Sequence, residues 1–212
     1  MTVLLDVFAS PRHVSSRVRV LCGSFVGVWC GGHAGGQVVT VDLPALDQGI
    51  PELDAWDVEA KLQMMYGQGK LTQELAKRWD TLTRFTDQLH LADVVLISSP
   101  MWNFSVPWTL KRWLDVVVQP RLTFEVRDGA YHGLLKGRKG VLLLTRDGAY
   151  TPGSPMEKMD FQLPYLRQVM GFLGIDPVHA VVAEPMSAGG PEVAAKALAK
   201  AIGEAEALAR TL

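Results

Sequence analysis

The chain has 212 residues and balances 21 lysine and arginine residues against 22 aspartate and glutamate residues, so its net charge at pH 7 is −1. This near-neutral balance excludes a basic surface for nucleic acid or for an anionic membrane, and we expect neither partner. A hydrophobic content of 48% excludes a disordered chain. We expect a single globular domain over residues 1–212.

Apolar runs of strand length alternate with helical patterns along the chain. The expected strands cover residues 3–8, 37–42, 94–98, 140–145 and 178–183. The expected helices cover residues 16–29, 71–91, 108–117, 155–172 and 191–209, with a short additional helix near 58–65. A hairpin-like insertion is expected over 119–138. This alternation predicts an α/β fold with a doubly wound, five-stranded parallel sheet and helices on both faces.

Residues 20–41 contain no charged side chain, and their glycines are spaced as in membrane helices. The apolar part ends near Cys30, which leaves fewer residues than the ~20 that a bilayer requires. We therefore expect a helix that packs on the sheet and no membrane span. The amino-terminal residues lack a basic segment before their apolar run, so we expect the protein to remain in the cytoplasm.

The two cysteines, Cys22 and Cys30, have no neighbouring cysteine or histidine at ligand spacing. We expect neither a disulfide scaffold nor a metal site, and a reducing compartment agrees with this pattern.

The turn after the first expected strand contains hydroxyl groups and no glycine. It therefore lacks the Gly-x-Gly-x-x-Gly pattern of dinucleotide-binding folds, and residues 67–70 lack the pattern of a P-loop. Hydroxyl groups and free backbone N–H groups at a helix amino terminus can hold a single phosphate group. The candidate residues are Ser10, Ser15, Ser16 and Arg17. Ser15 and Ser16 also suit plain helix caps, which leaves both interpretations open.

Two further polar loops follow the third and fourth expected strands. The first contains Pro100, Met101, Trp102, Asn103 and Phe104, and its asparagine offers both a donor and an acceptor to a heteroaromatic ring. The second contains Thr145, Arg146, Asp147 and Gly148. In a sheet of order 2-1-3-4-5, a planar ligand binds where the carboxyl ends of the first and third strands meet. The three loops therefore predict an FMN site in a flavodoxin-like fold.

A set of motifs extends from the loop at Pro100 towards the carboxyl terminus. Its residues are Pro100 to Phe104, Val106-Pro107, Leu110-Lys111, Asp115, Thr123-Phe124, Gly133-Leu134, Tyr165-Leu166 and Gly171 to Ile175. With these motifs, the sequence resembles the FMN-dependent NAD(P)H azoreductase and quinone reductase family over nearly its whole length.

The resemblance implies roles for residues in each loop. Ser10 and Ser16 match positions that hold the FMN phosphate, residues 101–104 match the loop around the isoalloxazine ring, and residues 145–148 match the loop at its pyrimidine edge. Phe124 and Phe172 match aromatic residues on the substrate face. The resemblance also implies a homodimer with active sites at the subunit interface, and ping-pong hydride transfer from NADH or NADPH.

Two positions depart from the family pattern. Val14 stands where the phosphate turn usually has a serine, which predicts weaker FMN binding unless Ser15 compensates. Asp147 replaces a glycine. If its carboxylate faces the flavin, it lowers the reduction potential, because it disfavours added negative charge on the ring; if it faces solvent, it has little effect.

We assign no catalytic residue, because the flavin itself carries the hydride chemistry. Trp102, Phe124 and Phe172 are expected to stack a flat quinone, azo compound or nicotinamide over the ring. Tyr150 is expected to line the substrate pocket or to orient a carbonyl group.

Two other functions remain open from the sequence. One is a flavodoxin-like electron carrier, although such carriers tend to be strongly acidic. The other is a specialised flavin reductase that acts on one biosynthetic intermediate. Separately, one connection is expected to reach a partner subunit's active site with its apolar side chains, which are Trp56, Leu62, Met64, Met65 and Tyr66.

Overall fold

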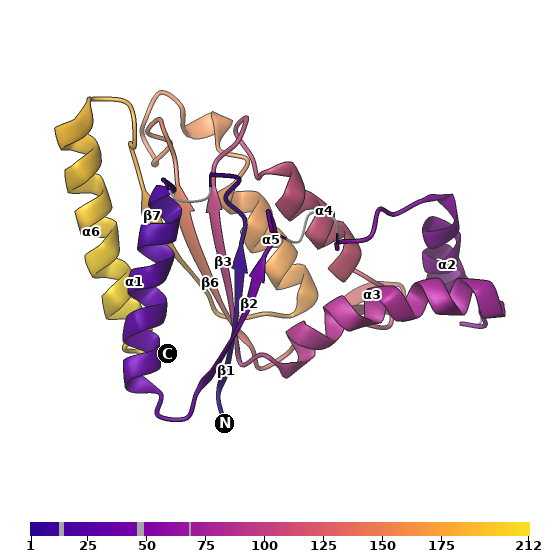
Figure 1. The fold of residues 1–212 in the computed structure, drawn as a ribbon. Helices are drawn as coiled ribbons and strands as arrows, with labels where there is room; N and C mark the ends of the chain where they lie inside the picture. Colours follow the sequence, from indigo (N-terminus) through magenta and orange to yellow (C-terminus); the bar gives the residue numbers. More distant parts are fainter. Residues whose placement is uncertain (13–14, 46–48, 68) are drawn as a thin grey trace.

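The computed structural model describes residues 1–12, 15–45, 49–67 and 69–212. Its central sheet has five parallel strands in the order β2-β1-β3-β6-β7, with helices on both faces (Figure 1). The strands are β1 (Val3–Phe8), β2 (Gln37–Asp42), β3 (Val94–Pro100), β6 (Lys139–Thr145) and β7 (Val178–Ala183). The α/β fold with a parallel five-stranded sheet, expected from the sequence, is confirmed.

Two helical layers enclose this sheet (Figure 1). On one face lie α1 (Arg17–Gly32) and α6 (Pro191–Ala209). On the other lie α3 (Gln73–Leu91), α4 (Trp108–Val117) and α5 (Leu163–Leu173). Helix α2 (Ala55–Tyr66) packs on α3 and projects away from the sheet.

The continuous apolar runs of the central strands are explained by these two layers. In β3, Val95 and Ile97 belong to the core beneath α3, α4 and α5, whereas Val94 and Leu96 belong to the core beneath α1 and α6. Successive side chains of a strand point to opposite faces, so a strand covered on both sides needs apolar residues at every position.

The hairpin-like insertion forms a separate two-stranded antiparallel sheet of β4 (Phe124–Arg127) and β5 (Ala130–Gly133). The expected order 2-1-3-4-5 counted only the strands of the main sheet. Because the hairpin contributes two numbered strands before the fourth of these, the observed order is β2-β1-β3-β6-β7.

The expectation of a helix over 155–172 is wrong in its first half. Residues 157–159 form only a short 3-10 helix, η1 (Glu157–Met159), and α5 begins at Leu163. The Asp160 side chain accepts hydrogen bonds from the backbone N–H groups of residues 162 and 163, which fixes the start of α5 there. Proline in the first turn of α5 suits this start better than Pro155 does.

Other helix boundaries differ by a few residues. The expected short helix near 58–65 is the longer α2, because Asp54 and Asp57 form a reciprocal capping box at its amino end. Thr72 caps α3, so that helix begins at Gln73 rather than Leu71. Helix α1 begins at Arg17 and continues past Trp29 to Gly32.

The uncharged segment over 20–41 is divided between α1, a turn and β2. Among the helices of the described residues, none has both the length and the apolar character needed to cross a bilayer. Cys22 is buried, Cys30 is exposed and both are free. Within the described ranges, no group of three or more His, Cys, Asp or Glu side chains is arranged to hold a metal ion.

Candidate functional site

The carboxyl ends of β1, β3 and β6 meet around a cavity of about 80 Å³. The register of the sheet brings them together, since Phe8 pairs with Ser98 and Pro100 pairs with Thr145. The cavity is lined by Ser10, Arg12, Ser16, Arg17, Pro100, Met101, Trp102, Thr145, Asp147 and Met186. Eight of the thirteen predicted cofactor residues are in this lining.

The amino end of α1 forms one wall of the cavity. Ser10 and Ser16 are buried, and the Ser16 hydroxyl donates to Ser10 Oγ at 2.8 Å instead of capping the helix. The first turn of α1 contains no acidic residue. Arg17 lies at the first helical position and donates from Nη1 to the Met186 carbonyl oxygen. Free N–H groups, hydroxyls and a positive helix end favour an anion such as phosphate.

Ser15 is exposed and does not line the cavity. Val14, for which weaker FMN binding is predicted, lies outside the described residues.

The loop after β3 contains a strained turn. Trp102 and Ser105 exchange two backbone hydrogen bonds of 3.0 and 2.9 Å, and the two residues between them have positive φ angles, 44° at Asn103 and 69° at Phe104. This is the geometry of a type I′ turn, which asparagine accepts readily. For phenylalanine the left-handed conformation costs roughly 1–2 kcal/mol. The turn presents Trp102 and Phe104 to solvent at 45% and 40% exposure.

Residues held in such uncommon backbone conformations cluster at binding and active sites, where the surrounding structure maintains them. Asn103 and Phe104 lie beside the cavity and outside its lining, at the tip of the turn.

In the loop after β6, successive side chains point in opposite directions. Thr145 and Asp147 line the cavity. The Asp147 carboxylate accepts a hydrogen bond from Ser187 Oγ at 2.9 Å, and its backbone oxygen accepts from the N–H groups of residues 187 and 188. The side chain of Arg146 points away from this cavity and is not part of its lining. A residue between two cavity-facing neighbours in an extended segment must point to the other side.

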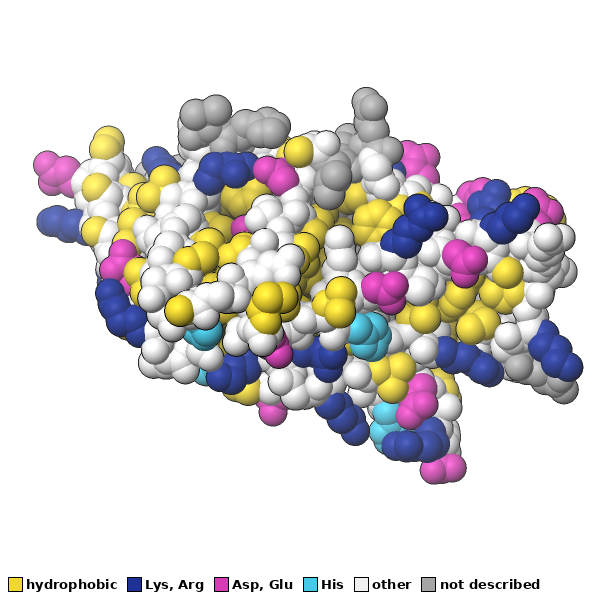
Figure 2. Space-filling model, turned by 60° about the horizontal axis from the view of Figure 1, so that its bottom comes forward, with side chains coloured by type: hydrophobic (Ala, Val, Ile, Leu, Met, Phe, Trp, Pro, Cys, Tyr) yellow, Lys and Arg dark blue, Asp and Glu magenta, His cyan; other side chains and the backbone are white. Residues whose placement is uncertain are grey.

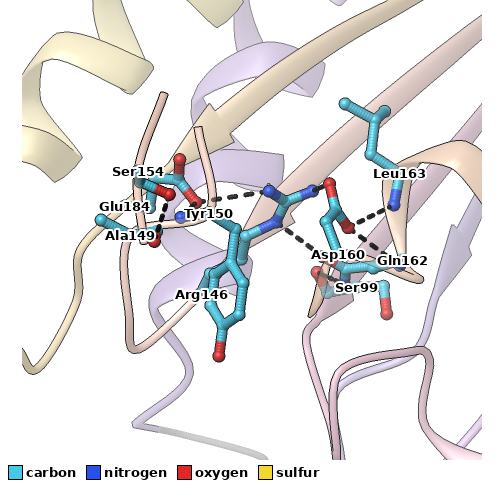
Figure 3. Close-up of polar contacts among 9 residues, drawn as sticks. All are labelled: Ser99, Arg146, Ala149, Tyr150, Ser154, Asp160, Gln162, Leu163 and Glu184. Atoms are coloured by element: carbon cyan, nitrogen blue, oxygen red, sulfur yellow. Dashed lines mark hydrogen bonds and ion pairs between the residues drawn. The ribbon is translucent and has the colours of Figure 1, made fainter. Parts of the chain in front are cut away.

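Arg146 and Tyr150 instead line a larger cavity of about 580 Å³ on the side of α5. Tyr150 is almost buried there, and Gly148 lies against its ring. Figure 3 shows the Arg146 side chain between Glu184 and Asp160.

Phe124 and Phe172 are not beside the cavity. They form an aromatic cluster with Tyr131, in which the ring centroids of Phe124 and Phe172 are 4.9 Å apart and those of Tyr131 and Phe172 are 5.5 Å apart. The cluster lies at the carboxyl end of α5, whereas the amino end of α5 lies near β3, where Gln162 Nε2 contacts the Ser99 oxygen at 3.4 Å. A helix of this length separates its ends by roughly 16 Å.

Three residues at the cavity were missed in the sequence. Arg12 lies in the first loop, two residues after Ser10. Met186 and Ser187 lie beyond the end of β7. The available signal was their position after an expected strand, the same signal that identified the other loops.

Strand β1 carries a buried carboxylate, Asp6. Burial raises the pKa of Asp6, and the Cys22 thiol donates to Asp6 Oδ1 at 3.4 Å. Burial and the neighbouring Asp6 charge raise the pKa of the Cys22 thiol to about 12. The thiol therefore stays protonated near neutral pH, and Cys22 is not available as a nucleophile.

Comparisons with known proteins agree with this arrangement. Residues 1–209 match the family described as having a flavodoxin-like fold. A protein of Nitratidesulfovibrio vulgaris (strain DP4) named FMN-dependent NADH:quinone oxidoreductase is 36% identical over 211 residues, 99% of each chain. A protein of the same name from Beijerinckia indica is 36% identical over 199 residues, 94% of each chain.

Solved structures of similar proteins have the same fold. An azoreductase from Bacillus anthracis str. Sterne superposes with a TM-score of 0.88 at 26% identity, with full coverage of both chains. An FMN-dependent NADH-azoreductase from Bacillus anthracis str. Ames Ancestor, solved in complex with FMN, gives a TM-score of 0.83 at 26% identity and covers 99% of this chain and 100% of that chain. The chain therefore belongs to the flavodoxin-like fold family, together with the quinone oxidoreductases and azoreductases named above.

Proposed function

We propose that the protein is an FMN-dependent oxidoreductase that transfers reducing equivalents from NADH to quinones, azo compounds or similar flat, electron-poor acceptors. The observation that carries this proposal is the amino end of α1, where two buried serines and two arginines adjoin the strained Asn103–Phe104 turn. The names of the relatives support the same cofactor, electron donor and acceptors.

The donor set around the small cavity fits a phosphate group. Its volume of about 80 Å³ corresponds to only a few water molecules, at roughly 30 Å³ each, so it accommodates a phosphate and not a three-ring system. We assign the phosphate to Ser10, Ser16, Arg12 and Arg17. We assign the ring to the adjoining surfaces of residues 100–104 and 145–148, where Trp102 and Phe104 offer exposed aromatic area.

When bound, FMN supplies the chemistry, by accepting a hydride and reducing the acceptor. The protein contributes placement. The Trp102 side chain offers a flat apolar surface on which a planar acceptor can be oriented, and orientation lowers the entropic cost of the encounter. The amide of Asn103 offers a donor and an acceptor at the tip of the turn.

We further propose that the active site is completed by a second copy of the chain. The Phe124–Phe172 cluster is separated from its own cavity by the length of α5, so a role at the substrate face requires the cavity of a partner subunit. Helix α2 has exposed Trp56, Leu62 and Tyr66 side chains, and Figure 2 shows hydrophobic side chains at the surface on the α2–α3 side of the molecule. Exposed apolar surfaces of this kind favour association.

Two variants that impair different parts of the site test this arrangement, at an FMN concentration too low to saturate Arg17→Gln. Arg17→Gln removes a phosphate ligand, and Phe172→Ala removes part of the aromatic cluster. If each site combines the two regions from different chains, a mixture of the two variants contains heterodimers with one intact site, and about a quarter of wild-type activity returns. If mass spectrometry verifies that heterodimers have formed and no activity returns, the shared site is contradicted.

Turnover tests the activity itself. The purified protein is expected to oxidise NADH with a soluble quinone and no partner protein, and to give parallel double-reciprocal plots. A requirement for a protein acceptor would instead identify a flavodoxin-like electron carrier.

We also propose that the chain forms one domain and acts in the cytoplasm. The match over residues 1–209 and the two free cysteines support this assignment.

A further inference from the structure

The side chain of Arg146 joins three acceptors from two separate segments of the chain (Figure 3). Its Nε donates to Gln162 Oε1 at 3.1 Å, Nη1 donates to Glu184 Oε2 at 3.3 Å and Nη2 donates to Asp160 Oδ2 at 2.9 Å. Arg146 is 3% exposed, and the two carboxylates are also largely buried. A planar guanidinium with three such acceptors is held in a single orientation.

Glu184 connects Arg146 to its own loop. The oxygen that accepts from Arg146, Oε2, also accepts from the backbone N–H of Tyr150 at 3.1 Å. The loop from 145 to 150 is therefore closed by a bond that depends on the position of the Glu184 carboxylate. The same loop carries Thr145 and Asp147 into the cavity wall.

Asp160 connects Arg146 to the other loop. Its Oδ1 accepts from the backbone N–H groups of residues 162 and 163 and so fixes the segment 160–163. Within that segment, the N–H of Phe161 donates to the backbone oxygen of Phe104 at 3.0 Å. The strained Asn103–Phe104 turn is therefore tied to a segment whose position is set by Arg146.

The charges explain why only arginine suits this place. One buried guanidinium faces two carboxylates, so removing it leaves two negative groups in a poorly solvated space without their shared cation. Repulsion between Asp160 and Glu184 then separates the two segments. A lysine ammonium is a compact point charge and cannot serve three acceptors in this geometry.

We propose that Arg146 is a positioning residue, which holds the loop 145–150 and the Asn103–Phe104 turn in the relative position that binds FMN, although its side chain does not reach the cofactor cavity. The proposal rests on the function proposed above and extends it.

A second cavity allows chemical rescue of a variant that lacks the Arg146 side chain. The cavity of about 580 Å³ is lined by Arg146, Asp160 and Glu184 together. A small guanidinium ion can enter it and occupy the place of a truncated side chain between the two carboxylates.

The same strand offers a matched control. Arg146 follows β6, whereas Arg138 precedes it and donates to the backbone oxygens of Leu89 at 3.1 Å and His90 at 2.6 Å. Both arginines connect β6 to neighbouring segments. Arg138 does so at the amino end of the strand, whereas the cofactor cavity lies at the carboxyl end. Loss of stability alone would affect both variants.

The experiment measures FMN dissociation constants for the wild type, Arg146→Ala and Arg138→Ala. We expect Arg146→Ala to weaken FMN binding at least about tenfold, as expected for breaking a buried charge network, and Arg138→Ala to change it less than about threefold. Millimolar ethylguanidinium should restore binding to Arg146→Ala, while ethylammonium at the same concentration should not. If Arg146→Ala does not fold, Arg146→Lys carries the same test, with weakened binding expected.

Hydrogen exchange in the flavin-free protein gives a second readout. The amides of Tyr150 and Phe161 should exchange faster in Arg146→Ala than in the wild type. Their exchange rates should not change in Arg138→Ala. Unchanged exchange at both amides, or FMN binding equal to that of the wild type, overturns the proposal, as does equal weakening in Arg138→Ala. If the wild type itself binds no FMN, the proposed function is refuted, whereas the exchange measurement still decides whether Arg146 holds the two loops.

Discussion

The contact between the β4–β5 hairpin and the carboxyl end of α5 offers a sharp test, because it positions the Phe124–Phe172 cluster. A methyl group added at Gly133 would lie 2.5 Å from the Leu173 carbonyl oxygen and closer still to the Gly174 nitrogen. These are backbone atoms, which cannot rotate out of the way. Gly133→Ala therefore forces the hairpin away from the helix.

The cost of this change has two parts. Overpacking costs about 1–3 kcal/mol. The shift also weakens the hydrogen bond from the Leu135 N–H to the Leu173 oxygen, now 2.9 Å, which is worth roughly 1 kcal/mol. We expect Gly133→Ala to lower the free energy of unfolding by about 2–4 kcal/mol and to disturb the aromatic cluster. Gly171→Ala, in the same helix with no atom within 4 Å of the new methyl group, should gain up to about 1 kcal/mol.

Urea unfolding at equal protein concentration measures both variants. The urea midpoints of the two variants should move in opposite directions, and quinone reductase activity should fall only in Gly133→Ala. A Gly133→Ala variant as stable and as active as Gly171→Ala would refute the reasoning about this contact.

Three further predictions concern the cofactor site and the buried carboxylate. Ser16→Ala and Arg17→Gln should each weaken FMN binding about tenfold, since each removes a charge-assisted hydrogen bond to the phosphate; flavin fluorescence measures this. Asp147→Gly should raise the flavin midpoint potential by about 20 mV, because it removes a negative charge from the cavity wall; spectroelectrochemical titration measures this. Asp6→Asn should stabilise the fold by roughly 1 kcal/mol at neutral pH. Burial raises the pKa of Asp6, so the advantage of the variant should be absent below the ordinary pKa of 3.8 and grow as the pH rises through the folded value.

Each of these has a clear contrary result. Lys200→Gln, at an exposed position on α6, controls for general charge effects, and equal loss of FMN affinity in it would remove the phosphate assignment. An unchanged or lower potential in Asp147→Gly would mean that the carboxylate does not act on the flavin. If the stability difference between Asp6→Asn and the wild type is largest in acid, burial does not raise the pKa of Asp6 as proposed.

The strands were predictable from the sequence because their signal is local. Residues 3–8, 37–42 and 178–183 have the expected limits, since each is a largely apolar or alternating run bounded by polar, proline-containing or glycine-rich segments. The start of α5 was not predictable in the same way. It depends on Asp160, which caps the helix at a later position than the start that Pro155 suggests. This role becomes evident only when the segment around Asp160 is placed against Arg146.

The site was predictable as a set of loops and less so as a set of side chains. Sheet topology alone brings residues 10–12, 15–17, 100–104 and 145–148 to the carboxyl ends of the strands. The direction of Arg146 depends on the alternation within a short extended segment. The distance of Phe124 and Phe172 from the cavity depends on the packing of the hairpin on α5, a tertiary contact that no local pattern encodes.

Binding and reduction of FMN test the central claim most directly. The purified protein should bind about one FMN per chain, and anaerobic NADH should bleach the visible flavin absorption without any partner protein. A colourless protein that fails to bind added FMN at high micromolar concentration would contradict the assignment of the α1 amino end as a phosphate site, and with it the proposed function.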